Sequence, residues 1–145
     1  MSEGSMREMV RQYFETQVEF SRHTSIQVDE VGEGSASCAI QLDGAVHRNG
    51  VGTVHGGVHA TLIDTTMAVA IASLGMRGAT TQMNVHFVGA ARDGRIVCTA
   101  EVIHRTGRTA TTEARVHDAS GELLALATAS FRIFAEGLTT VPAAE

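Results

Sequence analysis

The segment HGGVHATLIDTTMAVAIASLG, residues 55–75, decides the fold. From Gly57 to Gly75 most of its residues are apolar or small, and Asp64 is the only charged residue among them. This composition predicts a long helix covered on nearly all sides, with Gly75 suited to the position after its C-terminus. Because burying an unpaired carboxylate is costly, Asp64 is expected to be paired, solvated in a cleft, or catalytic. We interpret it as catalytic.

Alternating apolar residues on both sides of this helix predict an antiparallel sheet. Before it, strands are expected at 26–31 and 36–42, joined by Gly32-Glu33-Gly34, and after it at 81–87, 96–102, 110–116 and 123–133. The short turns between the last four strands favour antiparallel neighbours. The order predicts an α+β fold in which an antiparallel sheet wraps around a long central helix.

The two ends of the chain are expected to lie outside this sheet. A leading helix is predicted within residues 1–22, where Ser5 and Glu8 have the spacing of a capping box, and residues 137–145 are predicted to form a loose tail. The length of 145 residues suits one domain, 1–145. Since one sheet cannot cover the central helix on every side, the remaining face is expected to pack against a second copy, giving at least a homodimer.

Composition narrows the class of protein. The net charge of -5 argues against nucleic acid as a partner, and Asp64 and His59 argue against a membrane span. Met1 to Ser5 lack the basic and apolar regions of a signal peptide, so a cytoplasmic location is expected. Cys38 and Cys98 lack metal-ligand spacing and are predicted to be reduced core residues. His59, His86, His104 and His117 likewise lack ligand spacing and are assigned no role.

A second pattern leads into the central helix. It is the array Asn-x5-His-Gly-Gly-x6-Asp, formed by Asn49, His55, Gly56, Gly57 and Asp64. With this array, the order of elements and the strand QMNVHF at 82–87, the chain resembles the PaaI-like (phenylacetic acid degradation) branch of the hotdog-fold acyl-CoA thioesterases, in the 4-hydroxybenzoyl-CoA thioesterase superfamily. The resemblance covers most of the chain. It implies the hotdog fold, acyl-CoA as substrate, and a homo-oligomer that is commonly a tetramer.

Elementary chemistry agrees with a thioesterase. Hydrolysis develops negative charge on the carbonyl oxygen, and a helix N-terminus offers unpaired N–H groups to it. Gly56 and Gly57 have no side chains, so an acyl group can approach these donors closely. Asp64 is the only carboxylate on the helix that could serve as nucleophile or as general base for water. It follows Gly57 by seven residues, about 10 Å along the axis, so one chain cannot easily present both to the same carbonyl. Two such helices packed antiparallel about a two-fold axis can bring the start of one near the Asp64 of the other.

The resemblance assigns a role to each residue of the array. It implies that Gly57 supplies the oxyanion N–H, that the partner's Asp64 is the nucleophile or base, and that Asn49 and His55 orient the thioester or water. Members of the family often have a Ser or Thr that positions water at the start of the strand after the helix, and the resemblance gives this role to Thr80 or Thr81. The inter-subunit site is the rule in the family.

Each of these residues also has a structural interpretation. Asp64 could be a buried acid hydrogen-bonded to Thr61 or to a neighbouring chain. His55 could be a helix cap or a packing residue, and Asn49 could stabilise a turn. Gly56 and Gly57 could serve close packing. Coenzyme A carries phosphates, for which the candidates are arginines at two turns; solvated surface arginines are the alternative. These candidates are Arg92, Arg95, Arg105 and Arg108.

The predicted function is therefore hydrolysis of an aryl- or medium-chain acyl-CoA to free acid and CoA. No metal and no cofactor are expected beyond the coenzyme A of the substrate. Two alternatives remain: a hotdog hydratase or dehydratase, and a non-catalytic acyl-CoA-binding module. Release of free thiol separates hydrolysis from both.

Overall fold

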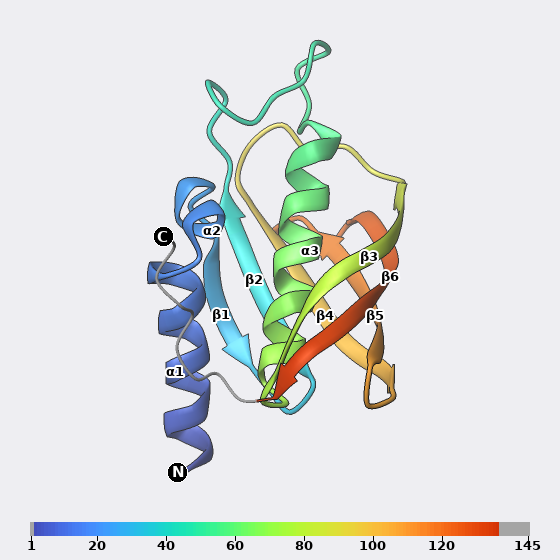
Figure 1. Cartoon of the computed structure of the whole chain (residues 1–145). Coiled ribbons are helices and arrows are strands. Elements are labelled where there is room, and N and C mark those ends of the chain that lie inside the picture. Colours follow the sequence, from blue (N-terminus) through green and yellow to red (C-terminus); the bar gives the residue numbers. More distant parts are fainter. Residues whose placement is uncertain (1, 137–145) are drawn as a thin grey trace.

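Residues 2–136 form two N-terminal helices, a hairpin, one long helix and four further strands (Figure 1). A computed structural model describes residues 2–136, and the expected tail at 137–145 lies outside the described residues. The elements are α1 (Glu3–Thr16), α2 (Glu19–His23), β1 (Gln27–Val31), β2 (Ser35–Gln41), α3 (Gly56–Ala72), β3 (Met76–Phe87), β4 (Arg95–Arg105), β5 (Thr109–His117) and β6 (Leu123–Glu136). The assignment of the whole chain, 1–145, to one domain stays a prediction.

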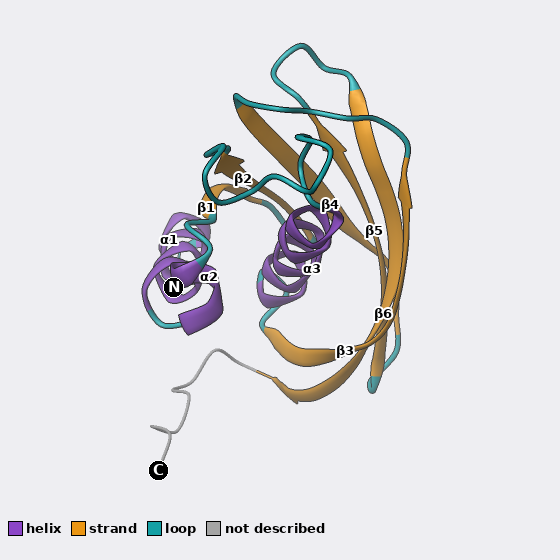
Figure 2. Cartoon of the chain, turned by 90° about the horizontal axis from the view of Figure 1, so that it is seen from above, coloured by secondary structure: helices purple, strands orange, loops and turns teal. Residues whose placement is uncertain are grey.

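Six strands form one sheet in the order β1-β2-β4-β5-β6-β3, and every neighbouring pair is antiparallel. Seen from above, the sheet curves around α3, while α1 and α2 lie beside the β1 edge (Figure 2). The expected α+β arrangement, an antiparallel sheet wrapped around a long central helix, is confirmed.

The N-terminal region differs from the expected single helix over 1–22. It is two helices, because α1 ends at Thr16 and Val18, in an extended conformation, precedes α2. The predicted capping box at Ser5 is also wrong. The cap is Ser2, whose Oγ accepts a hydrogen bond from the Ser5 N–H at 3.3 Å, so the helix begins one turn earlier.

The long helix α3 has one covered side and one open side. Its sheet-facing side chains are fully buried and include Leu62, Ile63 and Met67. On the other side, Gly57, Thr61, Asp64 and Ala68 are at least partly exposed; they recur at intervals of three and four and so share one face. The helix ends at Ala72, and Gly75, predicted to follow the C-terminus, adopts a φ of 75° in the turn to β3.

The two cysteines lie opposite each other in the core. Cys38 on β2 is the direct neighbour of Cys98 on β4, and both are free and fully buried. Burial raises the pKa of each thiol to about 12, so both stay protonated at neutral pH. The prediction of reduced core cysteines is confirmed.

The strand β3 forms an exposed edge of the sheet. It begins at Met76, five residues before the expected start, pairs only with β6, and most of its side chains are exposed. A long unpaired edge is a ready surface for another strand. None of the helices in the described part of the chain combines the length and hydropathy that a membrane crossing requires.

Candidate active site

Asp64 lies in the middle of the open face of α3 and is half-buried. Its Oδ1 accepts a hydrogen bond of 2.5 Å from Thr80 Oγ1 on β3. The structural alternative with Thr61 does not apply, because the Thr61 hydroxyl donates instead to the Gly57 carbonyl at 2.8 Å. The structure thus pairs Asp64 with a hydroxyl and leaves the carboxylate within reach of solvent.

Of the two threonines named from the sequence, only Thr80 contacts Asp64. The Thr81 hydroxyl donates to the Ser130 carbonyl at 3.1 Å. The pairing of β3 with β6 shifts by one residue between Thr80 and Gln82, as in a β-bulge. A bulge redirects side chains locally, which explains why strand alternation alone left the choice open.

His55 is the N-cap of α3. Its backbone is extended, with φ −62° and ψ 136°, and its Nδ1 accepts a hydrogen bond of 2.9 Å from the Gly57 N–H. In a neutral imidazole this places the proton on Nε2. The Gly56 N–H, by contrast, has no acceptor among residues 2–136. The unpaired donor at the start of α3 is therefore that of Gly56, whereas the resemblance implies Gly57.

Asn49 shapes the loop that leads into α3. Its Oδ1 accepts hydrogen bonds from the N–H groups of Val51 and Thr53, each at 3.0 Å, and its Nδ2 donates to Thr53 Oγ1 at 2.9 Å. These contacts match the turn-stabilising interpretation. Within one chain Asn49 does not contact Asp64.

The proposed residues fall into two groups in a single chain. Asn49, His55 and Gly56 lie at the start of α3, while Asp64 and Thr80 lie about two helical turns further along. The open face of α3 connects the two groups. One carbonyl cannot contact both groups in the same chain.

The four arginines named for CoA do not come together. Arg92 and Arg95 lie at the start of β4 and Arg105 and Arg108 near its other end, roughly 30 Å away. Arg95 is already paired with Asp29, at 2.7 Å. Because the two turns lie at opposite ends of the sheet, the two pairs of arginines cannot meet one phosphate group in a single chain, and which of them contact CoA stays a prediction.

Arg48 is a further candidate for CoA binding that was not predicted from the sequence. Its Nε donates to the Arg92 carbonyl at 3.2 Å, and both residues lie beside the loop that carries Asn49. Arg48 lines a groove of about 960 Å³ at the start of α3, together with His23, His47, His55 and Gly57. In the sequence, only its position directly before Asn49 could have marked Arg48 as a candidate.

His59 is buried one turn into α3, at 3% exposure, and its Nδ1 has no partner within the described residues. Its ring lies 6.0 Å, centroid to centroid, from that of Phe87. A Cβ placed on Gly56 would lie 3.4 Å from the Phe87 ring. Phe87, itself 53% exposed, therefore borders both His59 and the start of α3.

Protonation of His59 is expected to destabilise the fold. Burial lowers its pKa below the usual value, so the folded state holds it neutral while the unfolded state takes up a proton below about pH 6.5. Its stabilising contribution is full above that pH and is lost as the pH falls. Urea unfolding at pH 7.5 and 5.5 should therefore show a smaller loss of stability for His59→Leu than for wild type. Equal losses in both proteins would contradict this.

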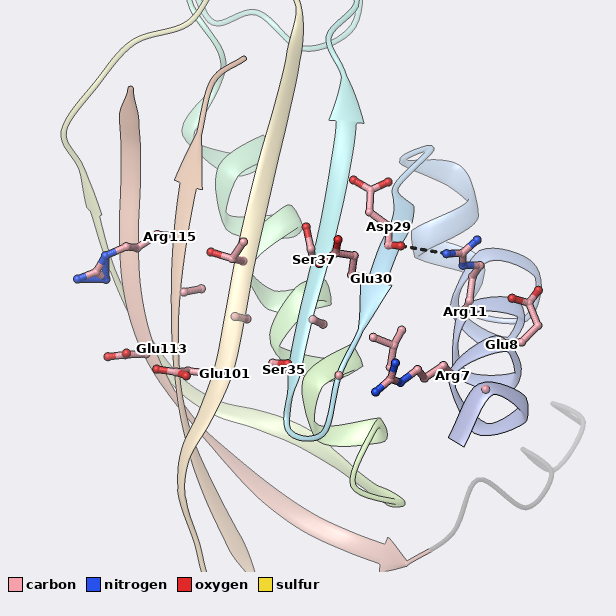
Figure 3. Close-up of a pocket in the computed structure, with 17 residues that line it drawn as sticks. Arg7, Glu8, Arg11, Asp29, Glu30, Ser35, Ser37, Glu101, Glu113 and Arg115 are labelled. Carbon is pink, nitrogen blue, oxygen red and sulfur yellow. Dashed lines mark hydrogen bonds between the residues drawn. The ribbon is translucent and has the colours of Figure 1, made fainter. Parts of the chain in front are cut away.

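A second large hollow lies on the other side of the sheet, between α1 and the strands (Figure 3). It measures about 840 Å³, with Arg7 and Arg11 on the helix side and Glu101 and Glu113 on β4 and β5. Glu113 lies opposite Glu101 and raises its pKa through hydrogen bonding and charge repulsion. None of the proposed catalytic residues lines this hollow. Size alone therefore does not identify the active site.

Metal ligands do not converge anywhere in residues 2–136: no three His, Cys, Asp or Glu side chains form a possible metal site there. The expected absence of a metal stays a prediction.

Comparison with known proteins identifies a matching family. Residues 51–125 match the family described as the thioesterase superfamily. Human acyl-coenzyme A thioesterase 13 is 34% identical over an alignment of 96 residues that covers 63% of this chain and 68% of the human protein.

Solved structures share the fold of this chain. The PaaI protein of the Escherichia coli phenylacetic acid degradation operon superposes with a TM-score of 0.86 at 19% identity, over 94% of this chain and 99% of PaaI. A hypothetical thioesterase of Streptococcus pneumoniae, solved with coenzyme A, gives 0.73 at 20% identity, over 77% and 88% of the two chains. At these identities the likeness shows the fold.

Proposed function

Because the chain belongs to the thioesterase superfamily, we propose that it is an acyl-CoA thioesterase that hydrolyses aryl- or medium-chain acyl-CoA to free acid and CoA. One observation carries the choice of site: Asp64, held by Thr80, lies on the open face of the helix whose first N–H group is unpaired. This combination offers a base or nucleophile and an oxyanion donor, the two groups that thioester hydrolysis needs.

In this proposal the oxyanion is stabilised at the start of α3. The Gly56 N–H is the first choice, because it is free, whereas Gly57 already donates to His55. Gly57 would become a donor only if the imidazole of His55 rotated away. The positive end of the helix dipole favours negative charge at both positions. His55 and Asn49 then act by fixing the geometry of the helix start.

Asp64 can bring about attack on the carbonyl carbon in two ways. Either its carboxylate attacks, forming an anhydride that water then hydrolyses, or it takes a proton from a water molecule that attacks. In both routes the C–S bond breaks and the sulfur leaves as CoA thiolate, which takes up a proton. Thr80 donates to Oδ1, so it fixes the orientation of the carboxylate and leaves Oδ2 available. In a single turnover in ¹⁸O-water, a product that carries an Asp64 oxygen and no ¹⁸O identifies direct attack with water cleaving the anhydride at the Asp64 carbonyl.

The complete site is proposed to form between two chains. Asp64 and the start of α3 lie too far apart in one chain, and the open face of α3 and the β3 edge are both exposed. If two copies join these surfaces about a two-fold axis, their α3 helices run antiparallel, and the Gly56 N–H of one chain faces the partner's Asp64. We therefore propose at least a dimer, and a tetramer by resemblance to the family.

The CoA portion is proposed to lie in the groove at the start of α3. Arg48 lines it, and Arg92 lies next to Arg48, so both can meet phosphate oxygens. Arg95, Arg105 and Arg108 stay candidates only where a neighbouring chain brings them to this groove. His55 and Gly57 line the groove, so it lies next to Gly56, the proposed oxyanion donor.

A substrate panel tests the proposed function. The purified protein is incubated with phenylacetyl-, hydroxyphenylacetyl-, benzoyl- and straight-chain acyl-CoA, and free thiol is measured. Thiol release above the uncatalysed rate is the expected result. Binding of these thioesters without release of thiol would contradict it and would favour a binding module; a modified acyl group still attached to CoA would favour a hydratase.

A further inference from the structure

A small apolar cavity lies beside the Asp64–Thr80 pair, between the N-terminal helices and the C-terminal half of α3. Its volume is about 220 Å³. Helix α1 contributes Tyr13 and Phe14, the link to α2 contributes Val18, and Phe131 on β6 contributes a further ring. The rings of Tyr13 and Phe14 meet edge to face at 5.2 Å, which makes that wall a packed surface.

Two separate elements connect this cavity to Asp64. On α3 the cavity is lined by Ala68, which follows Asp64 by one helical turn on the same open face. On β3 it is lined by Gly78, two residues before Thr80. By either path the nearest wall is about 6–7 Å from the hydrogen-bonded pair. An acyl group whose carbonyl is at Asp64 can therefore extend directly into the cavity.

The wall composition determines the kind of ligand. Arg77 is the only charged residue that lines the cavity, and small side chains on α3 leave the space open. Apolar walls with few polar groups suit a hydrocarbon chain or an aromatic ring. The volume limits the size, because a cavity of about 150 Å³ already accommodates benzene. About 220 Å³ is enough for one ring with a short linker or for a tail of roughly six to eight carbons, and too small for a long fatty chain.

We propose that this cavity is the acyl pocket, and that α1 and the link to α2, with Val18 at its wall, set the maximum length of the acyl group. The role of this pocket in the reaction rests on the proposed thioesterase function. Its ability to bind an acyl tail does not depend on that function. Residues 1–22, which in sequence lie outside the helix and strands of the catalytic site, are thereby part of substrate selection.

Two opposite changes at Val18 test the pocket through activity. Val18 is partly buried and has an extended backbone, so a larger side chain there can be accommodated without breaking a helix. In wild type, kcat/KM should rise about fourfold for each methylene until the pocket is full. Val18→Phe should lower octanoyl-CoA hydrolysis about tenfold or more with butyryl-CoA within about twofold of wild type, and Val18→Ala should shift the optimum to longer chains.

A matched control is Ile103→Phe, which adds the same ring at a 48% exposed position of β4 outside the cavity. It should leave the profile of kcat/KM against chain length unchanged. Thermal unfolding of each variant checks that folding is preserved. The proposal is overturned if Val18→Phe and Val18→Ala, both folded, keep the wild-type profile.

A binding measurement separates the pocket from catalysis. Tyr13 is the only tyrosine of the chain, which has no tryptophan, so intrinsic fluorescence reports on the wall of this cavity. Octanoate should change the Tyr13 signal, acetate should not, and Val18→Phe should abolish the octanoate response. No response to octanoate in wild type would overturn the pocket even if the protein hydrolyses CoA thioesters. A response without any thiol release would instead contradict the thioesterase proposal and retain the pocket.

Discussion

Replacement of Asp64 by asparagine is expected to lower kcat for CoA thioester hydrolysis by ~10²-fold or more while the fold is preserved. The amide has nearly the same shape, and its oxygen can still accept the hydrogen bond that Thr80 donates. It cannot accept a proton from water or attack as a carboxylate, so both proposed routes are lost. Thiol release from the best substrate of the panel, measured beside thermal unfolding, provides the comparison.

The control for this change is Glu33→Gln, which also removes one carboxylate but lies at the exposed turn between β1 and β2. It should retain wild-type turnover. A folded Asp64→Asn protein with unchanged turnover would end the catalytic role of Asp64. Asp64 would then be a structural acid held by Thr80.

Replacement of Gly56 by proline is expected to lower kcat about 10²- to 10³-fold, the usual effect of losing one oxyanion donor. Gly56 is the first residue of α3, a position where proline is well tolerated. The preceding residue, His55, already has the extended backbone that proline requires before it. Since the Gly56 N–H has no acceptor in the described chain, its removal costs no internal hydrogen bond.

Gly56→Ala separates the N–H from the added bulk. Alanine keeps the donor, and its Cβ would meet the Phe87 ring at 3.4 Å, within van der Waals contact. Alanine should therefore lower kcat less than proline does. The loss of kcat with alanine measures how closely the acyl group approaches the backbone. If the two folded variants lose the same activity, the Gly56 N–H is not the oxyanion donor.

The fold could be predicted from the sequence because its signals are local and repeated. The apolar run with Asp64 identified α3, and two-residue alternation identified β4, β5 and β6. Local signals could not decide between two similar residues that can play the same role. Ser2 and Ser5 are both good caps, and only the first helical turn itself shows that Ser2 serves α1.

The site could be predicted only in part, for the same reason. The spacing from Asn49 to Asp64 selected the candidate residues, but it could not show which backbone N–H is free, because that depends on where the His55 ring lies. The choice of Thr80 over Thr81 depends on a bulge in the pairing of β3 with β6. The acyl pocket joins residues of α1, α3, β3 and β6, which are distant in sequence.

Subunit mixing tests the central claim most directly, namely that thioester hydrolysis uses Asp64 of one chain and the start of α3 of another. Asp64→Asn and Gly56→Pro are expressed together or refolded together in equal amounts, and thiol release is compared with that of each variant alone. Half of the dimers are then mixed, and each mixed dimer contains one intact site, so about a quarter of wild-type activity is predicted. A mixture no more active than its two components, although mixed dimers form, would contradict the account.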